Sequence, residues 1–232
     1  MSGNMALWSG FSSFFSIWQV CILQISPFFI AYMVGLYLLT LDQKNNPGLW
    51  TWVVLPSISY SIGFTVFYSL LIASGLNVSR ILIYNIGNLR VTAGIIILLA
   101  GLYILLNDRI SFLRRKHSPL LLNILSLLIG ISFAIIYSPC ITPALSDIMG
   151  LASQRVTAGE GWYLAFCYGL GISIALISST VIIILLLRKR AFVLNNISLM
   201  KIICSIIVLI PALLNIGGLM RHYKAMVLGL LV

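Results

Sequence analysis

The segment AIIYSPCITPAL, residues Ala134–Leu145, places one cysteine, Cys140, between two prolines, Pro139 and Pro143, inside a long apolar run. Because proline removes a backbone N–H and clashes with the preceding helical turn, this segment is expected to interrupt its own helix. In a membrane, the freed carbonyl groups are tolerated only where protein or a water-filled cavity receives them. Two interpretations are open: a simple proline kink beside a buried thiol, or a helix break that opens Cys140 to partners.

The composition around this segment is that of a membrane protein. Of the 232 residues, 61% are hydrophobic and 8% are charged, and the mean hydropathy is +1.11. A soluble domain averages about 25% charged residues, so a globule of this composition would expose large apolar patches. The net charge is +10, but the basic residues gather in short connectors rather than on one continuous face, which argues against nucleic acid as a partner. The expected partner is the lipid bilayer.

Six apolar runs are long enough to be transmembrane helices, which need about 20 residues each. They cover residues 12–40, 51–74, 89–106, 119–146, 162–187 and 198–220. The first, third and fifth connectors carry eight Lys and Arg residues, whereas the second, the fourth and the C-terminal tail carry four. Because cytoplasmic loops are enriched in Lys and Arg, the odd connectors are expected in the cytoplasm and both termini outside it.

The two halves of the chain share three similarities, which recur in the same order. They are the Ser-Pro pairs at 26–27 and 138–139, the motifs YSIGF at Tyr60 and YGLGI at Tyr168, and the span starts NLRV and SLMK, which contain Arg90 and Lys201. The offsets are 112, 108 and 111 residues. Because three spans per half is an odd number, the second half enters the membrane from the opposite side, as in an inverted repeat.

The sequence therefore predicts a single all-α integral membrane domain over residues 1–232, with one repeat at about 12–106 and the other at about 119–220. Pro27 and Pro139 are expected to break the first and fourth of its six helices near the centre of the bilayer.

The remaining candidate residues carry weaker signals. Asp147 follows the Cys140 motif, and an acid within a membrane is a functional candidate, whereas at the membrane interface it would have no such role. Cys21, Cys167 and Cys204 lie in unbroken apolar runs, where cysteine behaves as a small hydrophobic residue. The sequence has no CxxC pattern and no His spacing typical of a metal site, so neither a metal nor another cofactor is expected.

The segments SPCITPALSDIMGLAS, YLAFCYGLGISIAL and RVTAGIIILLAGLYIL carry a family resemblance. Together with the rest of the chain, they resemble the CcdA proteins and the membrane domain of the DsbD thiol-disulfide interchange proteins. The resemblance implies inverted repeats with a Pro-Cys motif in each half, whose two cysteines form a central disulfide. It also implies that cytoplasmic thioredoxin reduces this disulfide and that thioredoxin-like proteins on the other side receive the electrons, often for cytochrome c maturation.

This chain departs from the family pattern in its first half. By position, the resemblance assigns the second-half cysteine to Cys140, but the first-half cysteine would fall on Phe28, and the proline expected three residues later is replaced by Ala31. With Phe28 the usual central disulfide cannot form. Cys21 is seven residues earlier, about 10 Å along a helix, whereas a disulfide joins Cα atoms about 4.4–6.8 Å apart.

Two classes of function follow from these observations. The first is a CcdA-like thiol-disulfide carrier, an oxidoreductase in class, with Cys140 as the reactive thiol and thioredoxin-like partners on one or both sides. A partner subunit would then supply the second thiol. The second class is a small-solute or metal-ion transporter, or a structural subunit of a membrane complex. Loss of the partner cysteine favours the second class, and the retained Pro-Cys-x-x-Pro segment favours the first. The expected location is a bacterial inner membrane or an organellar equivalent.

Overall fold

A computed structural model describes residues 2–15, 20–41, 53–74, 76–106, 119–136, 143–154, 156–188 and 196–219, together with 222 and 226. Within these residues every regular element is a helix, which confirms the all-α class. The helices are α1 (Gly3–Phe15), α2 (Val20–Leu41), α3 (Leu55–Ile72), α4 (Asn77–Tyr84), α5 (Ile86–Leu106), α7 (Pro119–Ile136), α8 (Pro143–Ser153), α9 (Ala158–Arg188) and α11 (Ile197–Ile216).

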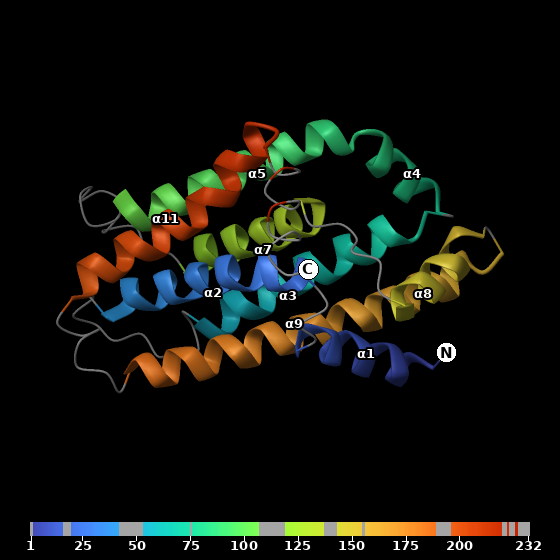
Figure 1. The fold of residues 1–232 in the computed structure, drawn as a ribbon, viewed down its shortest axis with the longest axis horizontal. Coiled ribbons are helices and arrows are strands. Elements are labelled where there is room, and N and C mark those ends of the chain that lie inside the picture. Colours follow the sequence, from blue (N-terminus) through green and yellow to red (C-terminus); the bar gives the residue numbers. More distant parts are fainter. Residues whose placement is uncertain are drawn as a thin grey trace.

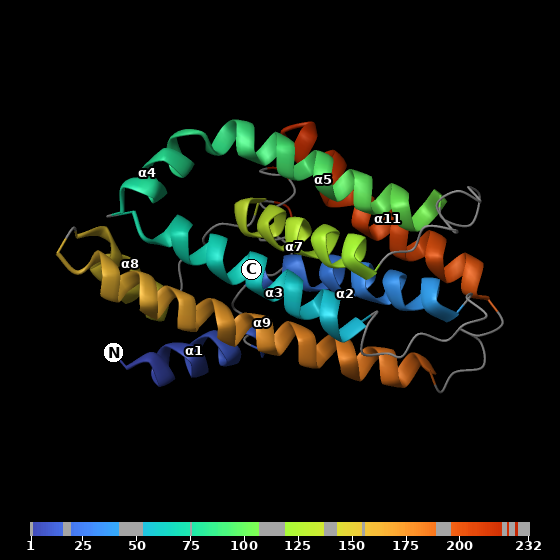
Figure 2. The ribbon, with the colours of Figure 1, turned by 180° about the vertical axis from the view of Figure 1, so that it is seen from behind.

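The long helices form an elongated bundle and run along it in alternating directions (Figures 1 and 2). Helices α2, α5 and α9 end, and α3, α7 and α11 begin, at the same end of this bundle. The sequence between these helix ends is that of the first, third and fifth connectors, of which the third and fifth are rich in Lys and Arg. We call this end the basic end and the opposite end, where α4 lies, the α4 end.

Helix α2 lies in the interior of the bundle. Every residue from 31 to 39 is buried, whichever side of the helix it is on. A helix that is apolar all round must be covered on all sides. Helices α9 and α11 pack against α2, and Figure 1 shows α3 and α7 beside it as well.

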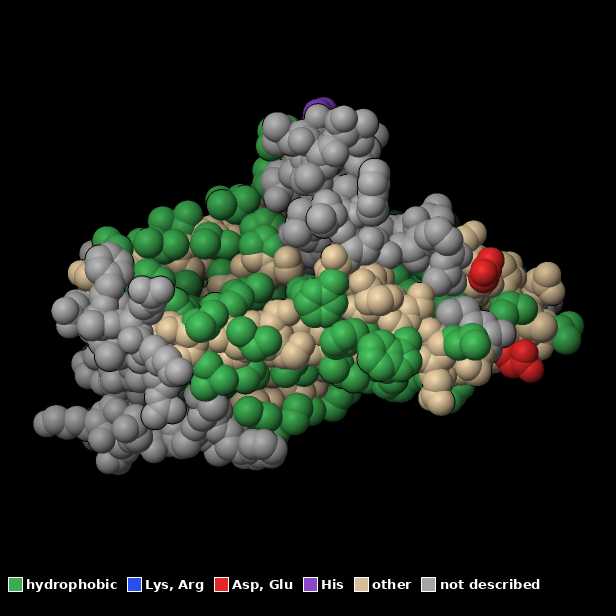
Figure 3. Space-filling view, turned by 60° about the horizontal axis from the view of Figure 1, so that its bottom comes forward, with side chains coloured by type: hydrophobic (Ala, Val, Ile, Leu, Met, Phe, Trp, Pro, Cys, Tyr) green, Lys and Arg blue, Asp and Glu red, His purple; other side chains and the backbone are tan. Residues whose placement is uncertain are grey.

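The outer helices have the exposure pattern of a lipid-facing surface. On α5, Val91, Ile95 and Leu99 are exposed at four-residue spacing, while Gly94 and Ile97 face the bundle. Such a stripe in water would be an aggregation hazard, whereas in a bilayer it faces lipid. Figure 3 shows hydrophobic side chains over the middle of one face, with the acidic side chains at one end.

Four of the described helices are long and apolar enough to cross a membrane: α3, α5, α9 and α11. Two shorter apolar segments, Ser26–Leu39 of α2 and Leu120–Ile136 of α7, accompany them. The membrane-protein class predicted from composition is therefore supported by helix length. The arrangement as six spans in an inverted repeat stays a prediction.

The predicted break at Pro27 is wrong, because α2 continues through this residue. The first predicted span is instead divided between α1, which ends at Phe15, and α2, which begins at Val20. The Pro27 side chain is exposed, while Phe28 and Phe29 beside it are buried in the core. Packing of these neighbours holds the helix together, and proline inside membrane helices is tolerated where the surroundings compensate for the freed backbone group. Pro211 likewise lies inside α11.

Glycines bring α3 and α7 into backbone contact. A Cβ at Gly63 on α3 would lie 2.5 Å from the Leu127 carbonyl oxygen on α7. A Cβ at Gly130 on α7 would meet the Tyr60 carbonyl oxygen and lie 2.9 Å from the Phe64 nitrogen on α3. Small residues at such positions let membrane helices approach closely, which increases their packing contacts.

The crossing of α1 and α9 repeats this pattern. A Cβ at Gly171 on α9 would meet the Leu7 carbonyl oxygen and lie 2.7 Å from the Phe11 nitrogen on α1. A Cβ at Gly10 on α1 would meet the Tyr168 carbonyl oxygen on α9. Helix α1 therefore uses the same glycine-to-carbonyl contacts toward α9 that α7 uses toward α3.

Candidate functional site

The predicted site residues of the second half lie only partly within the described chain. Pro139 and Cys140 lie outside it, and the helix break expected there stays a prediction. The described residues on either side belong to α7, as far as Ile136, and to α8, from Pro143. Asp147 lies one turn into α8 and is exposed.

The first-half position assigned by the resemblance is occupied by a core side chain. Phe28 is 4% exposed, and Phe29 beside it is fully buried. The Phe29 ring lies 4.3 Å from the Tyr60 ring, centroid to centroid. The position to which the resemblance assigns the first-half thiol is therefore packed with aromatic side chains in this protein.

An aromatic column extends from Phe29 along α3. The ring centroids are 6.0 Å apart between Tyr60 and Phe64, 5.3 Å between Phe64 and Tyr68, and 6.4 Å between Tyr68 and Tyr168 on α9. Aromatic pairs at such distances contribute about 0.5–1.5 kcal/mol each beyond the area they bury. The Tyr60 hydroxyl is buried and has no hydrogen-bond partner among the described residues. The column therefore connects Phe29, next to the first-half position Phe28, with Tyr168 on α9.

A row of buried hydroxyl groups lies on α3 at four-residue spacing. It consists of Ser57, Ser61, Thr65 and Ser69. Within α3, the Ser61 hydroxyl donates to the Ser57 carbonyl at 2.9 Å, and the Ser69 hydroxyl donates to the Val66 carbonyl at 2.8 Å. Bonds of this kind satisfy a hydroxyl inside an apolar bundle and leave its oxygen free to accept a further hydrogen bond.

Two hydroxyl pairs join helices far apart in the sequence. Thr65 Oγ1 and Ser173 Oγ, on α3 and α9, lie 3.1 Å apart. The Tyr32 hydroxyl on α2 lies 2.8 Å from Ser126 Oγ on α7. In an apolar medium such interhelical bonds fix the relative placement of helices, because an unpaired hydroxyl there is costly.

Two of the four cysteines have described side chains, and both are free. Cys167 on α9 is 8% exposed and Cys204 on α11 is 5% exposed. The Cys167 thiol interacts with the Tyr163 hydroxyl, one helical turn earlier. A Cβ at Gly35 on α2 would lie 3.7 Å from the Cys204 Cβ, so Cys204 packs against α2. Both thiols fit the structural role expected from the sequence.

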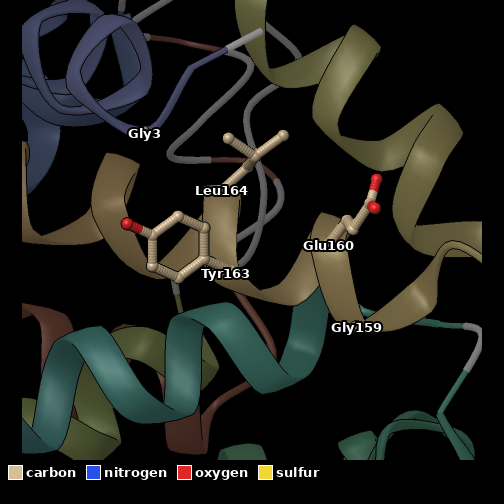
Figure 4. Close-up of a pocket in the computed structure, with 5 residues that line it drawn as sticks. All are labelled: Gly3, Gly159, Glu160, Tyr163 and Leu164. Atoms are coloured by element: carbon tan, nitrogen blue, oxygen red, sulfur yellow. The ribbon is translucent and has the colours of Figure 1, made fainter.

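A pocket of about 340 Å³ lies where α1 and α9 begin. Gly3, Gly159, Glu160, Tyr163 and Leu164 line it (Figure 4). The Tyr163 hydroxyl and the Glu160 carboxylate do not point toward one another in this view. Within the described part of the chain, no three His, Cys, Asp or Glu residues gather as a metal site would require. The pocket therefore offers one carboxylate and no paired acid and base.

Three polar features were not predicted from the sequence. The hydroxyl row on α3 has a readable signal, because Ser and Thr recur every four residues from Ser57 to Ser69. Lys201 is 3% exposed although it belongs to the start of a span. Asn215 on α11 donates from its side-chain nitrogen to the Arg90 carbonyl on α5, a contact for which the sequence has no signal.

Comparison with known proteins gives one sequence relative. No family model and no solved structure matches the chain. The cytochrome c-type biogenesis protein CcdA of Halalkalibacterium halodurans is 27% identical to it over 182 residues, covering 73% of this chain and 71% of the relative. This similarity confirms the resemblance to the CcdA family that the motifs indicated.

Proposed function

We propose that this protein is a CcdA-like membrane carrier of reducing equivalents between thioredoxin-like proteins, with Cys140 as its reactive thiol. The observation that carries the proposal is the similarity to a CcdA protein over most of the chain, together with the Pro-Cys-x-x-Pro segment of residues 139–143.

The chemistry needs a thiol besides Cys140. The Cys140 thiolate attacks the disulfide of an oxidised acceptor, which forms a mixed disulfide and releases one acceptor sulfur as a thiolate. A thiol of a partner subunit then attacks the Cys140 sulfur and releases the acceptor in its dithiol form. This leaves a disulfide between Cys140 and the partner, which a thioredoxin dithiol reduces. The partner thiol is part of the proposal because Phe28 occupies the position of the family's other cysteine.

Two observations support the inverted repeat as the scaffold of this carrier. The glycine-to-carbonyl contacts of the α1–α9 crossing correspond to those of the α7–α3 crossing. Thr65 and Ser173, which share a hydrogen bond, are 108 residues apart, the same offset as between Tyr60 and Tyr168. Residues related by a two-fold axis touch one another only at that axis, so this pair is expected to mark the axis between the halves.

The orientation also belongs to the proposal. The third and fifth connectors, which are rich in Lys and Arg, follow helices that end at the same end of the bundle. The positive-inside rule then gives a cytoplasmic basic end and an extracytoplasmic α4 end, with both termini on the outer side. Thioredoxin would approach at the basic end and the acceptor at the α4 end, in a bacterial inner membrane or its organellar equivalent.

Trapping of mixed disulfides tests the proposal. In native membranes, where Cys140 is joined to the partner thiol, a thioredoxin whose resolving cysteine is replaced by serine is expected to attack that disulfide, release the partner thiolate and stay covalently bound to Cys140. The Cys140→Ser variant should lose the complex, and Cys204→Ser, which removes a buried thiol, should retain it. If the complex persists in Cys140→Ser, Cys140 is not the reactive thiol.

A second candidate function is a non-redox transporter or complex subunit on the same scaffold. It is favoured by the buried aromatic packing at Phe28 and by the hydroxyl row on α3, which supplies polar oxygen atoms inside the bundle. Solute uptake that is unchanged in Cys140→Ser, combined with no trapped thioredoxin, would support this alternative.

A further inference from the structure

A second pocket lies at the α4 end of the bundle and differs in character from the first. Its volume is about 300 Å³, at the lower limit of typical ligand pockets. Leu71, Ile72 and Ser74 at the end of α3, Ile83 on α4, Ile86 and Arg90 on α5, and Met149 on α8 line it. The pocket is therefore an apolar chamber with one cation, formed by four helices.

Arg90 is the polar feature of this pocket. Its guanidinium makes no ion pair or hydrogen bond with any described residue. Arg90 is exposed in the first turns of α5, and an arginine near the end of a membrane helix marks the membrane interface or a binding site. An arginine fork presents its N–H groups in the geometry that matches phosphate oxygens.

The position of Arg90 is fixed by contacts behind it. The Asn215 side chain on α11 donates to the Arg90 carbonyl. A Cβ at Gly94, one turn further along α5, would lie 2.9 Å from Ile216 Cγ1 and 3.0 Å from Asn215 Nδ2. This part of α5 is held against α11, so the guanidinium extends from an anchored backbone.

Helix α4 places the pocket at a lipid surface. Val78, Ile81 and Tyr84 on α4 are 55%, 64% and 89% exposed, and Figure 1 shows α4 projecting from the bundle end between α3 and α5. A short helix with apolar side chains on its outside lies in the membrane interface rather than in water. Phospholipid headgroups occupy that level of the bilayer.

We infer that this pocket binds one anionic phospholipid, with the headgroup phosphate on the Arg90 guanidinium and part of an acyl chain against Leu71, Ile83 and Met149. The inference goes beyond the proposed carrier function and does not depend on it. Charge complementarity selects the anionic class, because the described lining contains one cation and no acid. The apolar remainder of the lining selects a lipid over a free anion.

A bound lipid would join the two halves of the chain. The lining residues of α3, α4 and α5 belong to the first half, whereas Met149 lies on α8, which begins directly after the Cys140 segment. A ligand that binds only the assembled pocket stabilises the folded state. The lipid is therefore expected to hold α8 against the first half.

The test uses the purified full chain in a neutral detergent. Its thermal unfolding midpoint is measured with phosphatidylglycerol and with phosphatidylcholine of the same acyl chains, and native mass spectrometry counts bound lipids. We expect phosphatidylglycerol to raise the midpoint and to remain bound as one molecule. Arg90→Gln should weaken this binding about tenfold or more, which corresponds to loss of a hydrogen-bonded charge pair.

Two variants separate the pocket from general effects. Arg80→Gln removes the same charge at the same end; Arg80 is exposed, donates from Nε to the Ser74 carbonyl at 3.4 Å and does not line the pocket. It should retain the lipid effect. Ile83→Trp keeps Arg90 but fills the apolar space and should lose it. Lipid-free unfolding midpoints show that each variant folds.

Several outcomes would overturn the inference. An equal shift with phosphatidylcholine would show that the lipid's charge is not recognised. An equal loss in Arg80→Gln would assign the effect to the overall charge of this end. A full shift with inorganic phosphate alone would indicate a free-anion site, and displacement of the lipid by an acidic peptide would indicate a protein partner.

Discussion

The substitution Gly130→Ala should destabilise the bundle at the crossing of α3 and α7. The added Cβ would meet the Tyr60 carbonyl oxygen and lie 2.9 Å from the Phe64 nitrogen. Both neighbours are backbone atoms of α3, which cannot rotate away as a side chain would. The two helices must therefore move apart, and the buried rings of Tyr60 and Phe64 move with α3.

The magnitude follows from two opposing terms. Overpacking in a close-packed interior costs about 1–3 kcal/mol, whereas replacement of glycine by alanine inside a helix contributes about 1 kcal/mol in the other direction. Since both contacts are with backbone, we expect the upper part of the first range and a net loss of about 1–2 kcal/mol. For a chain of this length, that loss lowers the unfolding midpoint by about 2–8 °C.

Thermal unfolding of the purified protein in detergent measures this effect, and Gly150→Ala is the matched control. Gly150 lies inside α8, and a Cβ there would have no atom within 4 Å. The control should be neutral or more stable by up to about 1 kcal/mol. Gly10→Ala, at the corresponding crossing of α1 and α9, should resemble Gly130→Ala. If Gly130→Ala and Gly150→Ala have equal midpoints, the close approach of α3 and α7 is wrong.

Three further predictions concern the orientation, the thiols and the contact between the halves. A cysteine introduced as Arg115→Cys in the third connector should resist a membrane-impermeant reagent in intact cells and react after permeabilisation; labelling in intact cells would reverse the orientation. Cys140 should be alkylated faster than Cys204, whose side chain is 5% exposed, and equal rates by mass spectrometry would make Cys140 a packing residue. Thr65→Val and Ser173→Ala should show a coupling free energy of about 0.5–1 kcal/mol in a double-mutant cycle. If their effects on the free energy of unfolding are additive, the two hydroxyl groups share no stabilising hydrogen bond.

The sequence predicted the long helices well because their signal is local. Apolar runs of transmembrane length gave both ends of α3, α5, α9 and α11 to within four residues. The sequence analysis missed α1, which was merged into the first predicted span, and α4, which was assigned to the second connector. It also placed a break at Pro27, since the effect of a proline depends on whether neighbouring helices compensate for the lost hydrogen bond.

The candidate site was less predictable because its features depend on tertiary contacts. The burial of Phe28 and its place beside the aromatic column follow from how α2 and α3 meet, which no local pattern encodes. The same holds for Arg90, recognised in the sequence only as the start of a span. The pocket that it lines requires α3, α4, α5 and α8 to converge.

The backbone positions of the other three cysteines bear on the second thiol of the proposed carrier. Cys204 packs at the level of Gly35 on α2, and Cys21 precedes Gly35 by 14 residues on the same helix, about 21 Å along its axis. Cys167 lies next to Tyr168, at the crossing with α1, and interacts with Tyr163. A disulfide between Cys21 and Cys204 would need α2 to slide by about four turns, far beyond a side-chain adjustment. Cys21 and Cys204 therefore do not form a disulfide with one another that could serve the relay, and the proposal assigns the second thiol to a partner because Phe28 stands where the resemblance places the other cysteine.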